Sequence, residues 1–170
     1  MASLIGSYSL SFGLLFSVFI IFFSVRNLRD AEILDKKIIS FTFIQFFFVV
    51  ISFFGLIISF INSDFSNETV FNHSHTTKPL FYKISGTWGN HEGSLLLWLL
   101  VLTLFISIFL IKSNQQPNRY RIFTLLFQQI IIVGFFIFLI KTSSPFNYVF
   151  PTPNEGLGLN PILQDPALAI

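Results

Sequence analysis

Residues 81–94 read Phe81-Tyr82-Lys83-Ile84-Ser85-Gly86-Thr87-Trp88-Gly89-Asn90-His91-Glu92-Gly93-Ser94 and continue directly into the apolar segment Leu95 to Ile111. Side chains that bind, form hydrogen bonds or titrate are crowded into the first part, and the second part is long and apolar enough to cross a membrane. A working surface is therefore expected where this polar stretch enters the span.

The composition is that of an integral membrane protein. Of the 170 residues, 53% are hydrophobic and 11% are charged, about half the charged fraction that is usual in a soluble domain. There is no cysteine, which excludes disulfides, thiolate metal sites and a CxxC redox pair. Phe occurs 25 times, and folding does not require this, so we interpret the excess as codon bias of an AT-rich genome. Such genomes are often organellar, and the first apolar run is neither a cleavable signal nor a transit peptide, so a mitochondrially encoded protein is the hypothesis.

Four apolar runs predict an all-α integral membrane protein that forms a single membrane domain over residues 1–170. The spans are expected near residues 4–25, 38–61, 92–111 and 122–140. Runs of about 20 residues at about 1.5 Å per residue cover about 30 Å of hydrocarbon. Residues 62–91 are expected to form an outer loop, and residues 141–170 an outer tail that is too rich in Pro and Gly for a long helix.

The placement of Lys and Arg predicts the orientation. Seven of the ten basic residues flank the two short connections, and three are spread over the long loop and the tail. The positive-inside rule then puts both termini and the histidine-containing loop outside. Outside means the intermembrane space for a mitochondrial inner-membrane protein and the periplasm for a bacterial one.

The spans hold no charged residue or histidine at membrane depth, which argues against a proton pump or antiporter. The main buried polar candidates are Gln45, Gln128 and Gln129. We interpret them as interhelical hydrogen-bonding residues, worth about 1 kcal/mol each.

Two descriptions of the junction stay open. If the helix begins near Thr87, Trp88, His91 and Trp98 share one face with Glu92 and Leu95. Asn90 could instead be the N-cap, with Glu92 in the favourable first turn. In either description, the spacing of Gly89 and Gly93 allows another backbone to approach closely.

The side chains of the junction have structural as well as functional interpretations. Trp88 is equally an interfacial anchor or a partner contact, whereas packing is the better interpretation of Trp98. A local hydrogen bond is favoured over haem or metal ligation for His91. His73 and His75 form an HxH pair without a third ligand nearby, and Asn67 and Asn72 match the short glycosylation pattern, which matters only in the secretory pathway.

Two stretches resemble a known family. Residues 86–98, Gly86-Thr87-Trp88-Gly89-Asn90-His91-Glu92-Gly93-Ser94-Leu95-Leu96-Leu97-Trp98, resemble an early motif of the CcmF family of cytochrome c maturation proteins, the haem lyase component. Residues 154–166, from Asn154-Glu155-Gly156 to Asp165-Pro166, are similar to the loop that leads into a His-Pro-Pro motif in that family. The resemblance covers nearly the whole chain but only about the first quarter of an undivided member, as in split mitochondrial versions. The chain ends at Ile170, where the His-Pro-Pro would begin.

The resemblance implies an N-terminal subunit or fragment of the cytochrome c haem lyase that helps to build the outer platform for haem attachment. It implies no catalytic or metal-binding residue in this chain, and haem held mainly by partner chains, so the isolated chain is not expected to bind haem stoichiometrically. The implied partners are the remaining part of the lyase, other cytochrome c maturation proteins, apocytochrome c and membrane lipid, without nucleic acid. The expected haem or partner surface comprises Trp88, Gly89, Asn90, His91, Glu92, Gly93, Asn160, Gln164 and Asp165.

A change at this surface, such as Gly93→Leu, is expected to uncouple assembly without unfolding the helical unit. The alternative function is a structural or assembly subunit of a respiratory complex, and a transporter is a more distant third. Co-purification separates the first two, because a lyase piece should bring the chain with the family's Trp-rich segment.

Overall fold

The computed structural model describes residues 1–28, 34 and 36–158. Its long helices are α1 (Ala2–Asn27), α2 (Lys36–Ile61), α5 (His91–Lys112) and α6 (Asn118–Lys141). All four are long and apolar enough to cross a membrane. The all-α membrane fold with four spans is therefore confirmed, and the helices extend the expected spans by one to three residues at most ends.

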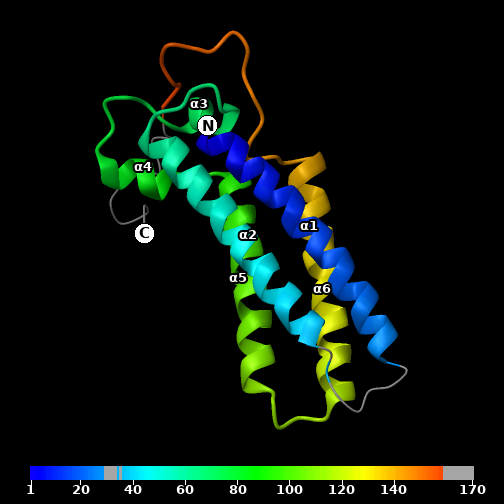
Figure 1. Ribbon diagram of the computed structural model, residues 1–170. Coiled ribbons are helices and arrows are strands. Elements are labelled where there is room, and N and C mark those ends of the chain that lie inside the picture. Colours follow the sequence, from blue (N-terminus) through cyan, green and yellow to red (C-terminus); the bar gives the residue numbers. More distant parts are fainter. Residues whose placement is uncertain (29–33, 35, 159–170) are drawn as a thin grey trace.

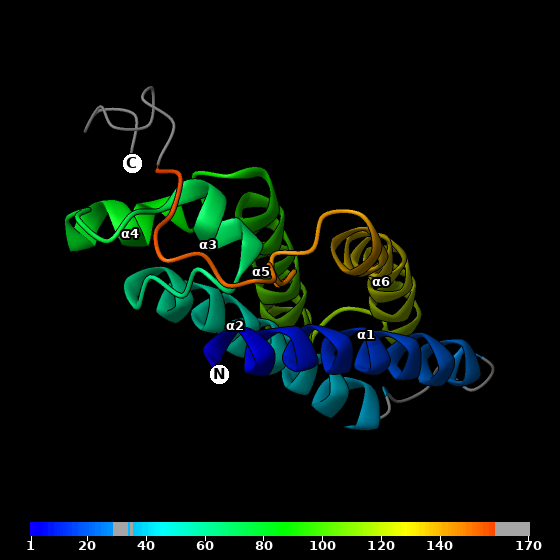
Figure 2. The same ribbon diagram turned by 90° about the horizontal axis from the view of Figure 1, so that it is seen from above.

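The long helices form an up-and-down bundle in which each helix packs against two others. The neighbouring pairs are α1 with α2, α2 with α5, α5 with α6 and α6 with α1. The N-terminus, residues 62–90 and residues 142–158 lie at one end of the bundle, which we call the outer end (Figures 1 and 2). The C-terminal ends of α1 and α5 and the N-terminal ends of α2 and α6 lie at the other end, the basic end. The two stretches that carry the resemblance thus begin at the same end of the molecule.

The interior of the bundle combines small and polar residues with a core of Leu, Ile and Phe side chains such as Leu56, Leu99 and Phe136. The buried face of α1 carries Ser9, Gly13, Ser17 and Ser24 among its members. Small residues allow helix backbones to approach closely, and in a bilayer this packing replaces the hydrophobic driving force. Other large apolar side chains point outward, as Phe47 and Phe127 do.

A polar network joins three helices at the centre. The side chains of Gln45 in α2 and Gln129 in α6 exchange two hydrogen bonds, of 3.2 and 2.9 Å. The Gln45 amide also donates to the hydroxyl of Ser17 in α1. The interhelical interpretation is confirmed for these two glutamines, whereas Gln128 is half-buried and lies outside this network.

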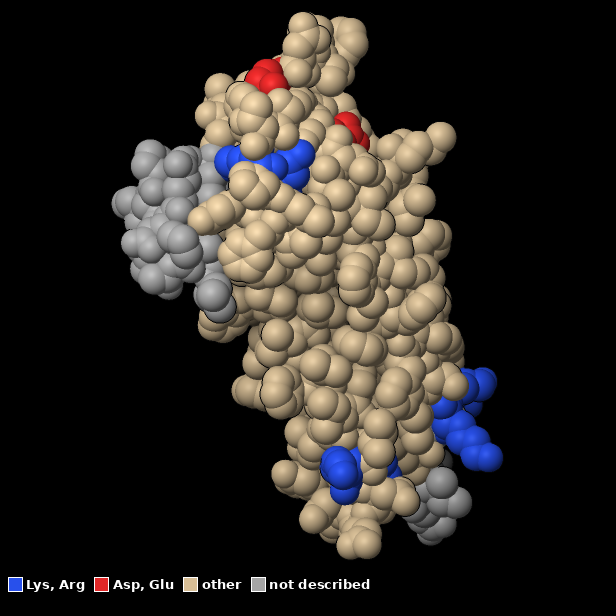
Figure 3. All heavy atoms as spheres, turned by 90° about the vertical axis from the view of Figure 1, so that its left-hand side faces the viewer, with Lys and Arg blue, Asp and Glu red and all other residues tan. Residues whose placement is uncertain are grey.

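The charged side chains of the described residues lie at the two ends of the bundle. On the face in Figure 3, all Lys, Arg, Asp and Glu atoms lie above or below a wide uncharged belt. This distribution matches a bundle that spans the hydrocarbon core.

Arg121, at the start of α6, is buried at 4% exposure. Its guanidinium donates to the carbonyl of Leu110 at 2.9 Å and to the hydroxyl of Ser113 at 3.1 Å. It therefore satisfies a carbonyl that the end of α5 leaves without a helical partner.

The outer loop contains two short helices that the sequence did not predict, α3 (Glu68–His73) and α4 (Leu80–Gly86). Asn67 caps α3 by accepting a hydrogen bond from the N–H of Val70 at 3.2 Å. Pro79 precedes α4, where its missing N–H costs nothing. The described part of the tail, residues 142–158, contains no helix, as expected.

Candidate functional site

Asn90 sets the geometry of the junction. It is the N-cap of α5, and its side-chain oxygen accepts the N–H of Gly93 at 2.7 Å. Its amide nitrogen donates to the carbonyls of Gly86 at 2.7 Å and Thr87 at 3.1 Å. One side chain therefore starts the span and fixes the turn before it, and of the two descriptions the cap is right.

Glycine is required at position 93 because the chain's own backbone leaves no room for a side chain there. A Cβ added there would lie 1.6 Å from the carbonyl oxygen of Thr87. The expectation that Gly93→Leu leaves the four-helix unit intact is therefore wrong, because the chain's own turn fills the space intended for a partner. Asn90 is buried as well, so these two residues shape the junction from within.

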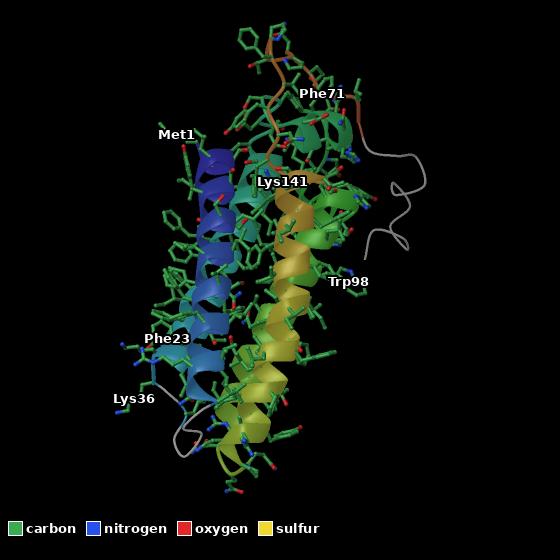
Figure 4. All side chains as sticks on the ribbon, turned by 90° about the vertical axis from the view of Figure 1, so that its right-hand side faces the viewer. Met1, Phe23, Lys36, Phe71, Trp98 and Lys141 are labelled. Atoms are coloured by element: carbon green, nitrogen blue, oxygen red, sulfur yellow. The ribbon has the colours of Figure 1, made fainter. Side chains whose placement is uncertain are left out.

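The two tryptophans differ from each other. Trp88 is half-buried and packs against the core, just before α5 begins. Trp98 is 64% exposed and points away from the bundle (Figure 4). The packing interpretation of Trp98 is therefore wrong within this chain, and an indole on the outer face of α5 is available to lipid or to a partner.

His91 takes a local hydrogen bond, as favoured. Its Nδ1 lies 2.8 Å from the hydroxyl of Ser143, which follows α6. Its ring meets the ring of Phe138 edge-on, with 6.3 Å between the centroids. These contacts orient the imidazole at the outer end of the α5–α6 pair.

An apolar groove continues from His91 along these two helices. Its volume is about 340 Å³, and it is lined by Leu95, Ile131, Gly134, Phe135 and Phe138. A Cβ added at Gly134 would meet no atom within 4 Å, so the groove is open at this position. Since Trp98 follows Leu95 by three residues, it stands on the same side of α5 as the groove.

The tail is bound to the outer loop. The carboxylate of Glu155 accepts hydrogen bonds from the N–H and the hydroxyl of Thr76, at 2.9 and 2.6 Å. The side-chain hydrogen bond from Thr76 holds the pKa of the Glu155 carboxyl below its usual value, and the backbone N–H of Thr76 acts in the same direction. The N–H groups of Leu157 and Gly158 donate to the carbonyls of Phe71 and Ser74, at 2.8 and 3.1 Å.

Asn67 joins the tail to the first helix. It is fully buried, and its amide nitrogen donates at 2.9 Å both to the hydroxyl of Ser3 in α1 and to the carbonyl of Pro145. A side chain used in this way offers no glycan acceptor. The matching sequence pattern thus reflects a structural asparagine.

His73 and Glu92 bring the loop and the junction together. Burial lowers the pKa of His73, the Glu92 carboxylate opposes this shift, and Lys78 adds to it. The Nδ1 atom of His73 is buried without a hydrogen-bond partner. Glu92 is half-buried in the first turn of α5, so the loop lies within electrostatic reach of the start of the span.

His75 and His91 contact polar side chains of the outer end. His75 lies against Thr77 at 2.9 Å and Glu155 at 3.8 Å, and His91 lies against Ser143. Within residues 1–28, 34 and 36–158, no three His, Cys, Asp or Glu side chains are grouped for a metal ion. Asn160, Gln164 and Asp165, the other expected surface residues, lie outside the described part.

Comparisons with known proteins agree with this arrangement. Residues 88–170 match the family model described as "Cytochrome C assembly protein". The solved structure of a protein titled "Cytochrome c Heme Lyase CcmF" superposes with a TM-score of 0.72 at 26% identity and covers 86% of this chain. The chain belongs to the CcmF family of cytochrome c maturation proteins.

Some relatives in the CcmF family are similar to this chain over nearly its whole length. The biogenesis protein CcmF of Haemophilus influenzae is 36% identical over 96% of this chain, and that of Escherichia coli is 35% identical over 94%. CycK of Bradyrhizobium diazoefficiens is 45% identical over 74% of this chain. The chain spans only 19% of CycK, 26% and 24% of the two CcmF proteins, and 25% of the solved chain.

Three structural residues escaped sequence reasoning. Asn67 carried the signal of an N-cap, an Asx residue before a short apolar run, but glycosylation was weighed instead. Arg121 was counted as a loop charge, and Thr76 has no signal in sequence because its partner is Glu155, 79 positions away. Such contacts depend on how the loop and the tail fold together.

Proposed function

We propose that this chain is the N-terminal part of a cytochrome c haem lyase and forms walls of the outer platform on which haem is attached to apocytochrome c. The observation that carries the proposal is that one family-like stretch, residues 154–158, is hydrogen-bonded to the outer loop through Thr76 and Glu155, at the end of the bundle where the other stretch, residues 86–98, begins. Attachment requires haem and the acceptor thiols to be held together outside the membrane. An outer cap on a four-helix anchor suits that role.

The remaining part of the lyase, on one or more separate polypeptides, is the proposed main partner and the main holder of haem. Other cytochrome c maturation proteins and apocytochrome c complete the proposed assembly. The relatives are about four times as long as this chain, so the proposed assembly contains further protein that can pack against the unit. The groove between α5 and α6, with Trp98 beside it and His91 at its outer end, is the surface that we assign to a transmembrane helix of this partner.

The proposed location is the mitochondrial inner membrane, with the N-terminus and residues 62–90 in the intermembrane space. The Phe-rich composition and the basic end support this location. A cysteine at Gln115, on the exposed basic-end loop, tests the orientation in sealed vesicles. Labelling by an impermeant reagent from the outer side would contradict it.

Affinity purification of the tagged chain tests the function. The variant is Trp98→Ala on α5, and the matched control is Phe54→Ala on α2, which is 56% exposed and far from the groove in sequence. We expect Trp98→Ala to reduce the co-purified lyase partner and the level of matured cytochrome c, and Phe54→Ala to leave both unchanged. Recovery of oxidase or dehydrogenase subunits instead would support the alternative, an assembly subunit of a respiratory complex.

A haem absorption spectrum of the purified chain tests whether this chain binds haem without its proposed partner. We expect no stoichiometric haem, because His91 and His75 already bind neighbouring side chains. A bis-His spectrum that disappears in His91→Ala would contradict the proposal that the partner is the main holder of haem.

A further inference from the structure

A second, larger crevice lies at the basic end, between α1 and α6. Its volume is about 560 Å³. It is lined by Val18, Ile21, Phe22, Val25, Arg26 and Val133. The α1 positions recur at intervals of three and four, so they form a single stripe along the helix. All lining residues except Arg26 are aliphatic or aromatic.

The crevice lies on the basic-end side of a tight contact between α1 and α6. At Gly13, an added Cβ would lie 2.7 Å from the ring of Phe136, so the two helices are packed tightly there. Toward the basic end, the buried face of α1 continues through Ser17, Ile20 and Ser24. Val18, Ile21 and Phe22 stand beside this buried face, and their side chains line the crevice.

Arg26 lies at the mouth of the crevice. It is exposed in the last turn of α1. No described side chain forms an ion pair or a hydrogen bond with its guanidinium. Lys36, Lys112 and Arg119 lie at the same end of the bundle, so an anion near Arg26 meets a favourable field.

The dimensions place these features at the right depths for a lipid. From Arg26 to Val18 is eight residues, or about 12 Å along α1 at about 1.5 Å per residue. Arg26 ends a span, at the level of the headgroups, and Val18 lies within the hydrocarbon. A guanidinium binds phosphate oxygens through two parallel hydrogen bonds, and basic pockets between spans on the inner side are suited to anionic headgroups.

We propose that this crevice is a binding site for an anionic phospholipid of the inner leaflet. The phosphate is held by Arg26, and one acyl chain lies along Val18, Ile21 and Val25 against Val133 of α6. A zwitterionic lipid offers the same chain but a neutral headgroup, so Arg26 supplies the selectivity. The site does not depend on the proposed lyase function.

Native mass spectrometry of the purified chain tests the site after exchange into micelles with equal amounts of phosphatidylglycerol and phosphatidylcholine. A basic residue near an anionic surface contributes about 1 kcal/mol, so we expect about fivefold more phosphatidylglycerol than phosphatidylcholine to be retained. Arg26→Gln should abolish the preference, and Arg26→Lys should keep part of it, because the charge stays but the paired hydrogen bonds are lost.

Two further variants distinguish lipid binding in the crevice from nonspecific attraction of anionic lipid to the basic end. Arg119→Gln removes an exposed charge at the same end that does not line the crevice, and it should leave the preference unchanged. Val133→Phe fills the crevice, and it should reduce retention of both lipids at least severalfold. Equal retention of the two lipids by the unchanged chain, equal losses in Arg26→Gln and Arg119→Gln, or full retention in Val133→Phe would each overturn the proposal.

Discussion

Adding one methyl group at Gly93 should damage the outer end more than a methyl group elsewhere in the bundle. In Gly93→Ala, the new Cβ would stand 1.6 Å from the Thr87 oxygen and 3.2 Å from the amide nitrogen of Asn90. The turn must move, and overpacking of this kind costs about 1–3 kcal/mol. If the movement also breaks the Asn90 cap, about 1 kcal/mol is added, so we expect the free energy of unfolding to fall by about 3 kcal/mol.

Gly134 provides the matched control. It also lies in a span, but a Cβ there would meet nothing within 4 Å. Replacing glycine by alanine within a helix stabilises it by about 0.5–1 kcal/mol, because the unfolded chain loses conformational freedom. Gly134→Ala should therefore be neutral or slightly stabilising, and the two variants should differ by about 3–4 kcal/mol.

Equilibrium unfolding of the purified chain in mixed micelles, followed by helical circular dichroism, measures this difference. Equal stabilities of Gly93→Ala and the unchanged chain would falsify the contact between residues 87 and 93. An equal loss in Gly134→Ala would show that any substitution of a span glycine is harmful, whatever its surroundings.

Three other predictions follow from buried or titrating groups. Arg121→Met should lower the free energy of unfolding by about 2–3 kcal/mol, because two hydrogen bonds from a charged donor are lost at the end of α5. The control Arg119→Gln changes an exposed residue and should alter the free energy of unfolding by less than about 0.5 kcal/mol. Equal effects of the two variants on unfolding in micelles would contradict this prediction. A double-mutant cycle of Gln45→Leu and Gln129→Leu should give a coupling free energy of unfolding of about 1–2 kcal/mol for the two reciprocal hydrogen bonds. A coupling free energy near zero would show that the two amides do not form these hydrogen bonds. The pKa values of His73 and Glu155 are both lowered in the fold, so the outer cap should be stable above the unfolded values and weaken as the pH falls, first as His73 and then as Glu155 takes up a proton. The protection of the Leu157 and Gly158 amides against hydrogen exchange, relative to the intrinsic exchange rate at each pH, should therefore fall on acidification, and His73→Gln should remove the step nearer neutrality.

The sequence predicted the membrane bundle well because hydropathy and charge report directly on the bilayer. Apolar length predicted four spans, and the helices agree with them closely. Interhelical hydrogen bonding by the glutamines was also predictable, because buried amides in a bilayer need partners. What could not be predicted was which two of the three glutamines meet, since that depends on helix rotation.

The site was harder to predict, because its contacts join residues that are distant in sequence. The rival descriptions of the junction could not be separated without the carbonyls of Gly86 and Thr87, which bind the Asn90 amide. Trp98 was misjudged because an indole within an apolar run gives no sign of whether it faces the bundle or the bilayer. The sequence correctly indicated that the site lies at the outer end of the bundle. It did not indicate which side chains at that end are buried and which are exposed.

The contacts at the two ends of the bundle imply different local stabilities. At the basic end, the Arg121 guanidinium is buried and holds α5 to α6 directly. At the outer end, the hydrogen bonds between Thr76 and Glu155 are exposed, and exposed hydrogen bonds compete with water and open at lower free energy than buried ones. Asn67, by contrast, ties the start of the tail to α1 through buried bonds. The tail can therefore open near Glu155 while its root and the four spans stay folded, and movement at that place rather than in the bundle would let the proposed outer platform admit a large substrate.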